Sequence, residues 1–431
     1  MTIIKRTGRI TWGALLLFVI GFVIYLNYGL YYAPRFARVE KDDVNTDLLA
    51  QLRFLKVSMH KDAPDKMQQY YPEGFVFMHA LYSLSWCEML KYIDKDSELY
   101  KEGHREIQYS YNEINSEKGK AVFQRGLQLP YGAFYTGWKN YVLGKKISVE
   151  KPADRDSTEV KAFEAGCAGI AEAITDSSAS PYPETYKGMA WPADVSVAIA
   201  CLANHDRIFK PKYAAAIQLW ISKVRPFLDQ DGLMPYGFDP LTLQAKGEAR
   251  GSSQSLIQNF LFEIDSSFCR EQFSIYKKLF LDSRAGLPGI REYRKGSKGK
   301  ADVDSAPVIL DIGGPASIVG LRIMSLMQEN ETAVGLRNSI ETFGFSTESN
   351  GQKKYLLGKL PMADAFICWA NATELNAATK RSTGKPWRMK FQLYSLLVLL
   401  SALLLLLRLV GVKFYSGKKR TPPHPNQDTL H

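Results

Sequence analysis

"VSVAIACLANHDRIF" at residues 195–209 is followed after three residues by "YAAAIQLWISKVRPFL" at 213–228. In both stretches the apolar residues recur at helical spacing, and the Lys-Pro-Lys between them breaks the pattern. Two such helices joined by a short turn pack against each other as a hairpin. The same pairing recurs at 255–265 with 266–281 and at 315–330 with 331–344. Because strand-like alternation is rare and brief, the sequence predicts an all-α domain of serial hairpins.

Loops rich in aromatic residues separate these hairpins, and helical segments at 75–93, 163–174 and 361–375 extend the series. This organisation favours an (α/α)6-type toroid, in which inner helices surround an axis and the loops at one end shape a cleft. A helical-repeat solenoid is the structural alternative. No fixed period supports it.

Several blocks of the chain resemble the linalool dehydratase/isomerase-like proteins. They are "QLPYGAFYTGWKNYVLG" (128–144), "PYPETYKGMAWPADVSVAIACL" (181–202), the long block at 231–280, and "ADVDSAPVILDIGGPASIVGLRIM" (301–324). The similarity extends over residues 70–375 and lies more in the order of the blocks than in identity. It implies an α/α toroid fold, in agreement with the hairpins.

The chemistry of that family does not transfer to this chain. In the enzyme that names it, cysteines flank the segment corresponding to residues 184–194 and help to convert the terpene alcohol. Here the segment reads "ETYKGMAWPAD" and holds no cysteine. The resemblance therefore predicts a fold and leaves the substrate open.

Apolar segments near both ends of the chain predict two membrane spans, at 10–32 and 391–412. Ile10–Leu26 and Phe391–Leu407 are uncharged, and each segment approaches the ~20 residues that cross a bilayer. A cleaved signal is the alternative for the first segment, but its apolar core is long for a signal and tyrosines crowd its exit.

The basic residues of the tails at 1–9 and 413–431 predict that both tails are cytoplasmic, although further basic residues precede the second span. Residues 33–390 then form an external domain, periplasmic or otherwise extracytoplasmic, held at the inner or plasma membrane.

The charge and the cysteines exclude several classes of function. The net charge of +11 is concentrated in the tails and in "REYRKGSKGK" at 291–300, which reads as a solvated loop, so we expect no nucleic-acid partner. The five cysteines are scattered without a CxxC pair, and the histidines lack HExxH spacing, so we expect buried thiols, no metal and no cofactor. The sequence leaves the oligomeric state open.

Carboxyl groups in loops are the candidates for acid/base chemistry, which on a glycan needs one protonated and one ionised group. Asp194 and Asp304 each precede an apolar run, and Glu292 is a third catalytic candidate. For Asp194 and Asp304 the competing interpretation is a helix cap or a turn. Other loop carboxyl groups belong to Glu73, Glu184, Asp239 and Asp302.

"EARGSSQS" at 248–255 is the second notable stretch, because the planar guanidinium of Arg250 suits an anionic or hydroxylated ligand. The competing interpretation is a serine cap with Arg250 paired to a carboxylate. Aromatic rings in the loops offer faces for a sugar or a carbocation, although core packing is the alternative for each one. The substrate-binding candidates are Glu73, Tyr71, Tyr131, Tyr135, Trp138, Trp191, Tyr236, Arg250, Ser252, Ser253 and Gln254.

These observations leave three functions open. The first is a membrane-anchored enzyme that acts by acid/base chemistry on an envelope glycan or polyol. The second is a lyase, dehydratase or isomerase of a hydrophobic substrate, which a cavity lined by Tyr, Phe and Met would favour. The third is a non-catalytic binding scaffold of the envelope. All three share a membrane-lipid partner, and the first two a small-molecule or glycan ligand.

Overall fold

The computed structural model describes residues 2–176, 180–300, 302, 305, 307–373 and 387–410. Two compact units are present: the described parts of Met1–Asn27 and Gln392–His431 form one, and those of Tyr28–Phe391 form the other. The larger unit carries all the candidate site residues that the structure describes. Asp304, one of the predicted catalytic residues, lies outside the described residues.

Within the described part of the larger unit, six helices form a closed inner ring. Each contacts the next along the chain and the last contacts the first, in the order α4 (Gly74–Leu90), α7 (Gly132–Val149), α9 (Pro192–Ile208), α11 (Gly251–Ile264), α13 (Gly314–Leu326) and α15 (Pro361–Asn371). This cyclic contact pattern is that of an α/α toroid. The predicted fold class is therefore confirmed.

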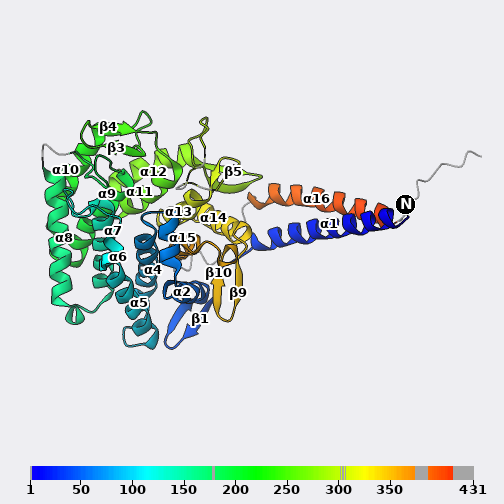
Figure 1. Cartoon of the computed structure of the whole chain (residues 1–431), viewed down its shortest axis with the longest axis horizontal. Helices are drawn as coiled ribbons and strands as arrows, with labels where there is room; N and C mark the ends of the chain where they lie inside the picture. The colour runs from blue at the N-terminus through cyan, green and yellow to red at the C-terminus, as the bar shows by residue number, and fades with distance from the viewer. Residues whose placement is uncertain are drawn as a thin grey trace, which may run out of the picture. The chain divides into compact units, whose positions relative to one another are not determined.

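An outer helix that is next in the chain packs on each of α4, α7, α9, α11 and α13, as Figure 1 shows for α8 and α10 beside α7 and α9, whereas α2 packs on α15. All three predicted hairpins are present, as α9 with α10, α11 with α12, and α13 with α14. The outer helices are α2 (Thr46–Met59), α3 (Ala63–Tyr70), α5 (Glu98–Asn115), α8 (Ser157–Thr175), α10 (Ala214–Val224), α12 (Ser266–Phe280) and α14 (Asn330–Phe343), with the short α6 (Glu117–Lys120) after α5.

Because outer helices return the chain after each inner helix, the inner helices run in the same direction and their N-termini share one end of the ring. Short antiparallel hairpins occupy the connections that lead into α11, α13 and α15, and one more precedes α2. They are β1 (Phe36–Val39) with β2 (Asp42–Asn45), β3 (Gly237–Asp239) with β4 (Gln244–Lys246), β5 (Leu281–Arg284) with β6 (Leu287–Ile290), β7 (Val308–Ile309) with β8 (Ile312–Gly313), and β9 (Thr347–Ser349) with β10 (Gln352–Lys354). Three single-turn 3-10 helices, η1 (Pro152–Asp154), η2 (Arg225–Phe227) and η3 (Leu356–Gly358), complete the described elements.

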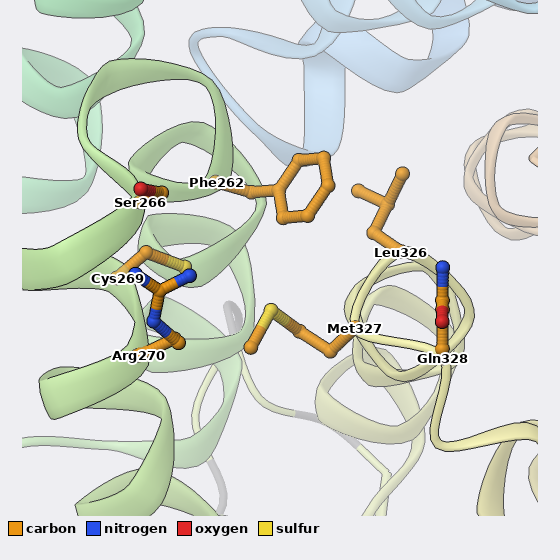
Figure 2. Close-up of a pocket in the computed structure, with 7 residues that line it drawn as sticks. All are labelled: Phe262, Ser266, Cys269, Arg270, Leu326, Met327 and Gln328. Atoms are coloured by element: carbon orange, nitrogen blue, oxygen red, sulfur yellow. The ribbon is translucent and has the colours of Figure 1, made fainter.

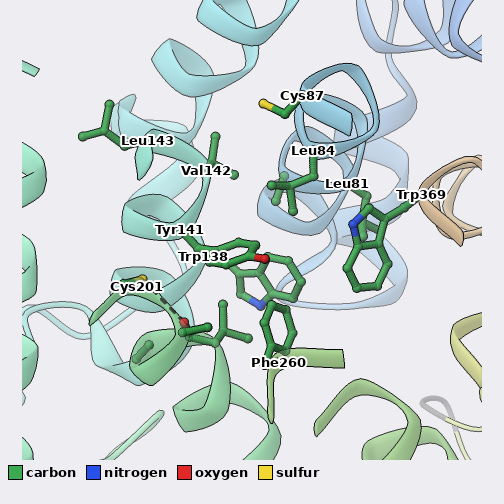
Figure 3. Packing of buried hydrophobic residues seen from close by; sticks show 14 of the residues in the cluster. Leu81, Leu84, Cys87, Trp138, Tyr141, Val142, Leu143, Cys201, Phe260 and Trp369 are labelled. Carbon is green, nitrogen blue, oxygen red and sulfur yellow. Dashed lines mark hydrogen bonds between the residues drawn. The ribbon is translucent and has the colours of Figure 1, made fainter. Parts of the chain in front are cut away.

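Aromatic side chains fill the axis of the ring. The Trp138 ring of α7 lies 5.2 Å from Phe77 of α4, 5.5 Å from Phe260 of α11 and 6.5 Å from Trp369 of α15, measured between ring centroids. Figure 3 shows Trp138, Phe260 and Trp369 converging with leucines of α4. Buried aromatic side chains contribute large apolar areas and preferred edge-to-face contacts. The centre of the toroid is thus a packed core.

The smaller unit is an antiparallel pair of long apolar helices, α1 (Thr2–Gly29) and α16 (Trp387–Val410). The Asn27 side-chain amide donates to the Ser395 hydroxyl at 2.9 Å, while Gly13 faces Leu409 near the other end. Both helices are long and apolar enough to cross a bilayer. In the most apolar 18-residue stretch of each helix, 0% of the residues of α1 and 11% of those of α16 are buried. Core helices of a soluble domain are mostly buried, so these two helices differ from them.

Candidate functional site at the N-terminal rim of the inner helices

The candidate site is the rim formed by the N-termini of the inner helices and the loops before them. Phe77 and Phe366, one turn inside α4 and α15, are half-buried, whereas Trp138 and Trp369 below them are buried. Solvent therefore reaches the first turn of the inner helices and stops at the aromatic core. Any ligand of this end binds on the rim.

The first group of rim residues comes from the loop before α9. The Tyr186 hydroxyl donates a short hydrogen bond to Glu73, which immediately precedes α4. Thr185 donates through its hydroxyl to the Asp194 carboxylate at 2.8 Å. The Trp191 ring stands edge-on to the Tyr186 ring, with centroids 6.0 Å apart. We call Glu73, Tyr186, Trp191 and Asp194 the tyrosine group.

Burial, together with the negative charges of Glu73 and Asp194, raises the pKa of the Tyr186 phenol. The phenol therefore stays protonated at neutral pH and acts as a hydrogen-bond donor to Glu73. All four members of the group are half-buried, so each retains access to solvent. Two carboxyl groups beside a phenol and an indole face are a set that can bind a hydroxylated ring and move a proton.

The loop that carries this group is fixed by the start of α7. Ala133 donates its backbone N–H to the Glu184 carbonyl at 2.8 Å, and Gly132 has φ +84°. A Cβ at Gly132 would lie 2.1 Å from the Thr185 carbonyl oxygen, so only glycine fits. Asp194 lies in the first turn of α9, and the cap position itself belongs to Trp191. Its acidic side chain there suits the positive end of the helix.

The second group surrounds Arg250, the residue before α11. The guanidinium donates from Nε to Glu292 at 2.9 Å and from both terminal nitrogens to the two oxygens of Asp302, at 2.6 and 2.9 Å. Its face lies 4.5 Å from the Tyr236 ring centroid and 5.5 Å from that of Tyr293. We call these five residues, with Ser252, the arginine network.

The two carboxylates of the arginine network have different environments. Glu292 is completely buried and accepts bonds from Arg250 and from the backbone and hydroxyl of Ser252. Burial raises the pKa of the Glu292 carboxyl even though Arg250 opposes it. Asp302 is 45% exposed, and its hydrogen bonds with Arg250 lower the pKa of its carboxyl to about 2. Arg250 is thus paired to carboxylates, as the competing interpretation of the sequence proposed.

The structure places several predicted ligand contacts in the core. Tyr135 and Trp138 are buried, and the Tyr135 hydroxyl donates to the Ile114 carbonyl at 3.0 Å. Gln254 is buried and donates to the Met234 carbonyl. These three side chains lie below the rim, and their role as ligand contacts stays a prediction. Tyr71, Tyr131 and Ser253 remain half-buried near the rim.

Sequence reasoning did not select Tyr186, Thr185, Tyr293 or Asp364. Asp364 sits in the first turn of α15, accepts the Tyr355 backbone N–H at 2.7 Å, and has a pKa that burial raises to about 7. Its second carboxylate oxygen has no hydrogen-bond partner among the described residues. The sequence pattern that could have selected Asp364 is a proline followed closely by an aspartate at a helix start, which "PMAD" shares with "WPAD".

Among the described residues, two recesses lie at the opposite end of the ring, where the inner helices end. Figure 2 shows one between α11, α12 and the end of α13, lined by Phe262, Cys269 and Met327. Its volume of about 180 Å³ is below the ~300–1,000 Å³ of small-molecule sites. In the same described part of the chain, no group of three or more His, Cys, Asp or Glu residues is placed to hold a metal.

No family model matches the chain, and no curated protein matches it either. Among solved structures, a D-mannose isomerase aligns at 9% identity and a TM-score of 0.41, over 83% of this chain and 97% of that chain. An unsaturated glucuronyl hydrolase from Streptococcus agalactiae aligns at 10% identity and a TM-score of 0.40, over 84% and 91%. Similarity at this level carries no argument about activity, and the fold assignment stands on the closed ring of helices.

Proposed function

We propose that this protein is a membrane-anchored enzyme that acts by acid/base chemistry on a glycan or polyol-like component of the cell envelope. The observation that carries the proposal is the tyrosine group, in which the Tyr186 phenol donates to the Glu73 carboxyl group and is influenced by the negative charge of Asp194. Glu73 and Asp194 supply the two carboxyl groups, and Tyr186 supplies a proton held on the phenol. Trp191 offers an indole face to a sugar ring.

Glu292 has a different role in this proposal from the one its sequence position suggested. Both of its oxygens are engaged below the rim, so it positions Arg250 and Ser252. Arg250 in turn holds Asp302, which is accessible to solvent. The arginine network then shapes the rim and the tyrosine group carries the chemistry.

The test compares the full chain in detergent with three rim variants, Tyr186→Phe, Glu73→Gln and Asp194→Asn. Asp156→Asn is the matched control, because Asp156 caps the outer helix α8 with the same type of side chain. Envelope glycan fractions are incubated with each protein, and products are measured by mass spectrometry. We expect product from the wild type and the control, and at least ~100-fold less from each rim variant. Equal product from all five proteins would place the reaction elsewhere.

A non-catalytic scaffold is the second candidate, and the filled axis favours it. A deep cavity would enclose a substrate and exclude water, whereas a rim over a packed core also suits simple binding. If the protein is a scaffold, Asp194→Asn leaves the cellular phenotype intact while changes in α1 or α16 abolish it. The same aromatic filling removes the open apolar cavity that a hydrophobic-substrate lyase or isomerase would need.

We also propose that α1 and α16 cross the membrane and that the toroid lies outside the cytoplasm. The five native cysteines are free and buried, so we expect them to react slowly with a maleimide. Labelling of the folded protein then reports the location of a single introduced, exposed cysteine. Leu241 lies at the tip of the β3–β4 hairpin and is 80% exposed. A membrane-impermeant maleimide labels Leu241→Cys in intact cells if the toroid is external. Labelling only after lysis would reverse the orientation.

A further inference from the structure

Large apolar side chains project from three loops of the toroid unit. Ile309 ends β7, Leu310 begins the β7–β8 turn, Phe343 ends α14, and Leu357 lies in η3. Ile309, Leu310 and Leu357 are each more than 60% exposed, and Phe343 is 46% exposed. Single exposed apolar residues are common on protein surfaces. We call these four residues the loop patch and ask whether one partner explains them together.

The backbone holds two of these leucines outward in an unusual conformation. Leu310 has φ +51° and Leu357 has φ +58°, in the left-handed region that favours glycine. Residues other than glycine that are held there cluster at functional and binding sites. A positive φ at both Leu310 and Asp311 belongs to a two-residue hairpin turn. What the turn leaves unexplained is an exposed leucine where Asn, Asp or Gly is usual.

Contacts within the toroid unit place the loop patch around the residues that lead into the apolar helices. The Phe343 ring lies 6.4 Å from the Phe391 ring of α16, between centroids. On the other side, Arg284 donates to the Leu310 carbonyl at 2.8 Å, and the adjoining turn at Gly286 lies against Trp387 and Lys390. Phe343 and the β7–β8 turn thus lie near the start of α16, and η3 adjoins the end of α14, where Leu356 donates its backbone N–H to the Gly344 carbonyl.

The same region carries the residue types of a membrane interface. The guanidinium of Arg388 lies 4.9 Å from the Tyr31 ring and 4.3 Å from the Trp387 ring, and it donates to the Leu30 carbonyl. Tyrosine and tryptophan are enriched at the level of lipid headgroups. Lys359 and Lys390 are exposed beside the patch, and their charge complements anionic lipids.

We propose that the loop patch lies in the interface of a bilayer that contains anionic lipids, so that the toroid rests on the membrane through these loops. The inference rests on the proposed membrane anchoring and goes beyond the proposed reaction. It also has a consequence for the site. Glu292 donates its backbone N–H to the Asp311 carbonyl, so the arginine network lies one residue from the lipid-contacting turn. The substrate then meets the rim at the membrane surface.

The test places a nitroxide spin label on Leu310→Cys or Leu357→Cys of the full chain, in nanodiscs of phosphatidylglycerol and phosphatidylcholine. Leu219→Cys is the matched control, because Leu219 is an exposed leucine of the outer helix α10. Power saturation with oxygen and with a water-soluble nickel chelate reports whether each label contacts lipid or water. We expect an oxygen-to-nickel accessibility ratio at least ~3-fold higher at positions 310 and 357 than at 219. Equal ratios at all three positions would overturn the proposal.

A second copy of the chain is the alternative occupant, and the same labels distinguish it. If two copies pair through the patch, their labels at position 310 lie within ~50 Å of each other and give a measurable spin–spin interaction, even when lipid is in large excess. That result would overturn the proposal. Labels that contact lipid without such distances support it. The readout needs no substrate, so its failure is separate from failure of the proposed reaction. Far-UV circular dichroism of each labelled protein confirms the helical fold.

Discussion

The axis of the toroid and its N-terminal rim are built from opposite kinds of residue. Along the axis, Trp138, Phe260 and Trp369 are buried and pack ring against ring. At the rim, Glu73, Tyr186 and Asp194 are half-buried and hydrogen-bonded. We therefore assign stability to the axis and propose that the rim carries the chemistry. A change on the axis should alter the free energy of unfolding, whereas a change at the rim should alter activity at nearly constant stability.

The largest expected effect is that of Trp138→Ala. Its side chain is buried at the centre of the aromatic core, and truncation of such a residue costs about 3–5 kcal/mol. Thermal unfolding of the full chain in detergent, followed by circular dichroism, measures the loss. Leu219→Ala on the surface of α10 is the control. A loss below about 1 kcal/mol would mean that the axis is not a packed core.

Asp364→Asn should stabilise the protein, but only at high pH. Burial raises the pKa of this carboxyl from 3.8 to about 7, so the folded state binds more protons than the unfolded state between these values. The contribution of the protonated Asp364 carboxyl to folding stability is fully present below pH 3.8 and is lost as the pH rises to about 7. At pH 8 the asparagine variant should gain stability, with an upper bound of roughly 4 kcal/mol, and near pH 4 it should match the wild type. Unfolding curves at the two pH values test this, and the same difference at both would contradict it.

Arg250→Met should cost about 2–3 kcal/mol, because it leaves Glu292 buried without its ion pair. The loss is smaller than for a fixed charge, since the raised pKa of Glu292 lets the carboxyl accept a proton. Chemical unfolding at pH 5 and pH 8 measures it, with the larger loss expected at pH 8. Arg225→Met breaks an exposed pair with Glu271 and provides the control. An equal loss for both arginines would mean that Glu292 is not isolated from solvent.

Tyr186→Phe should have the smallest effect on stability, below about 1 kcal/mol, because its partner Glu73 is half-buried and regains water. Its effect on product formation should be the largest, since the phenol holds the proton that is shared with Glu73. Unfolding and product assays on one preparation give both values. A large stability loss with unchanged product would assign Tyr186 to the structure of the rim.

The hairpins could be predicted because local patterns specify them. The apolar spacing at 195–209 and 213–228 predicts α9 and α10 to within a few residues, and Pro192 at the start of α9 marks the boundary. Trp191 and Asp194 could be selected because both stand at the start of a helix, at the cap and in the first turn of α9. Their role in a site stays a prediction. The ring closure, between α15 and α4, depends on residues nearly 300 positions apart and no local pattern encodes it.

The partners of the site residues could not be predicted for the same reason. Tyr186 meets Glu73 across 113 positions, and Arg250 meets Glu292 across 42. Only the assembled ring brings these pairs together. Tyr135 and Trp138 were expected at the cleft because they follow a Gly-containing loop, yet the direction of α7 turns them to Ile114 and the axis. Spacing along one helix does not reveal which face meets the centre of the ring.

Hydrogen–deuterium exchange with mass spectrometry tests the central claim most directly, using the full chain in nanodiscs with and without a panel of neutral and uronic-acid-containing oligosaccharides. The account predicts slower exchange in peptides covering 183–196 when an active oligosaccharide is present. Peptides covering 326–330, beside the recess at the opposite end, should be unchanged. Protection at 326–330 with none at 183–196 would contradict the claim that the N-terminal rim is the functional site.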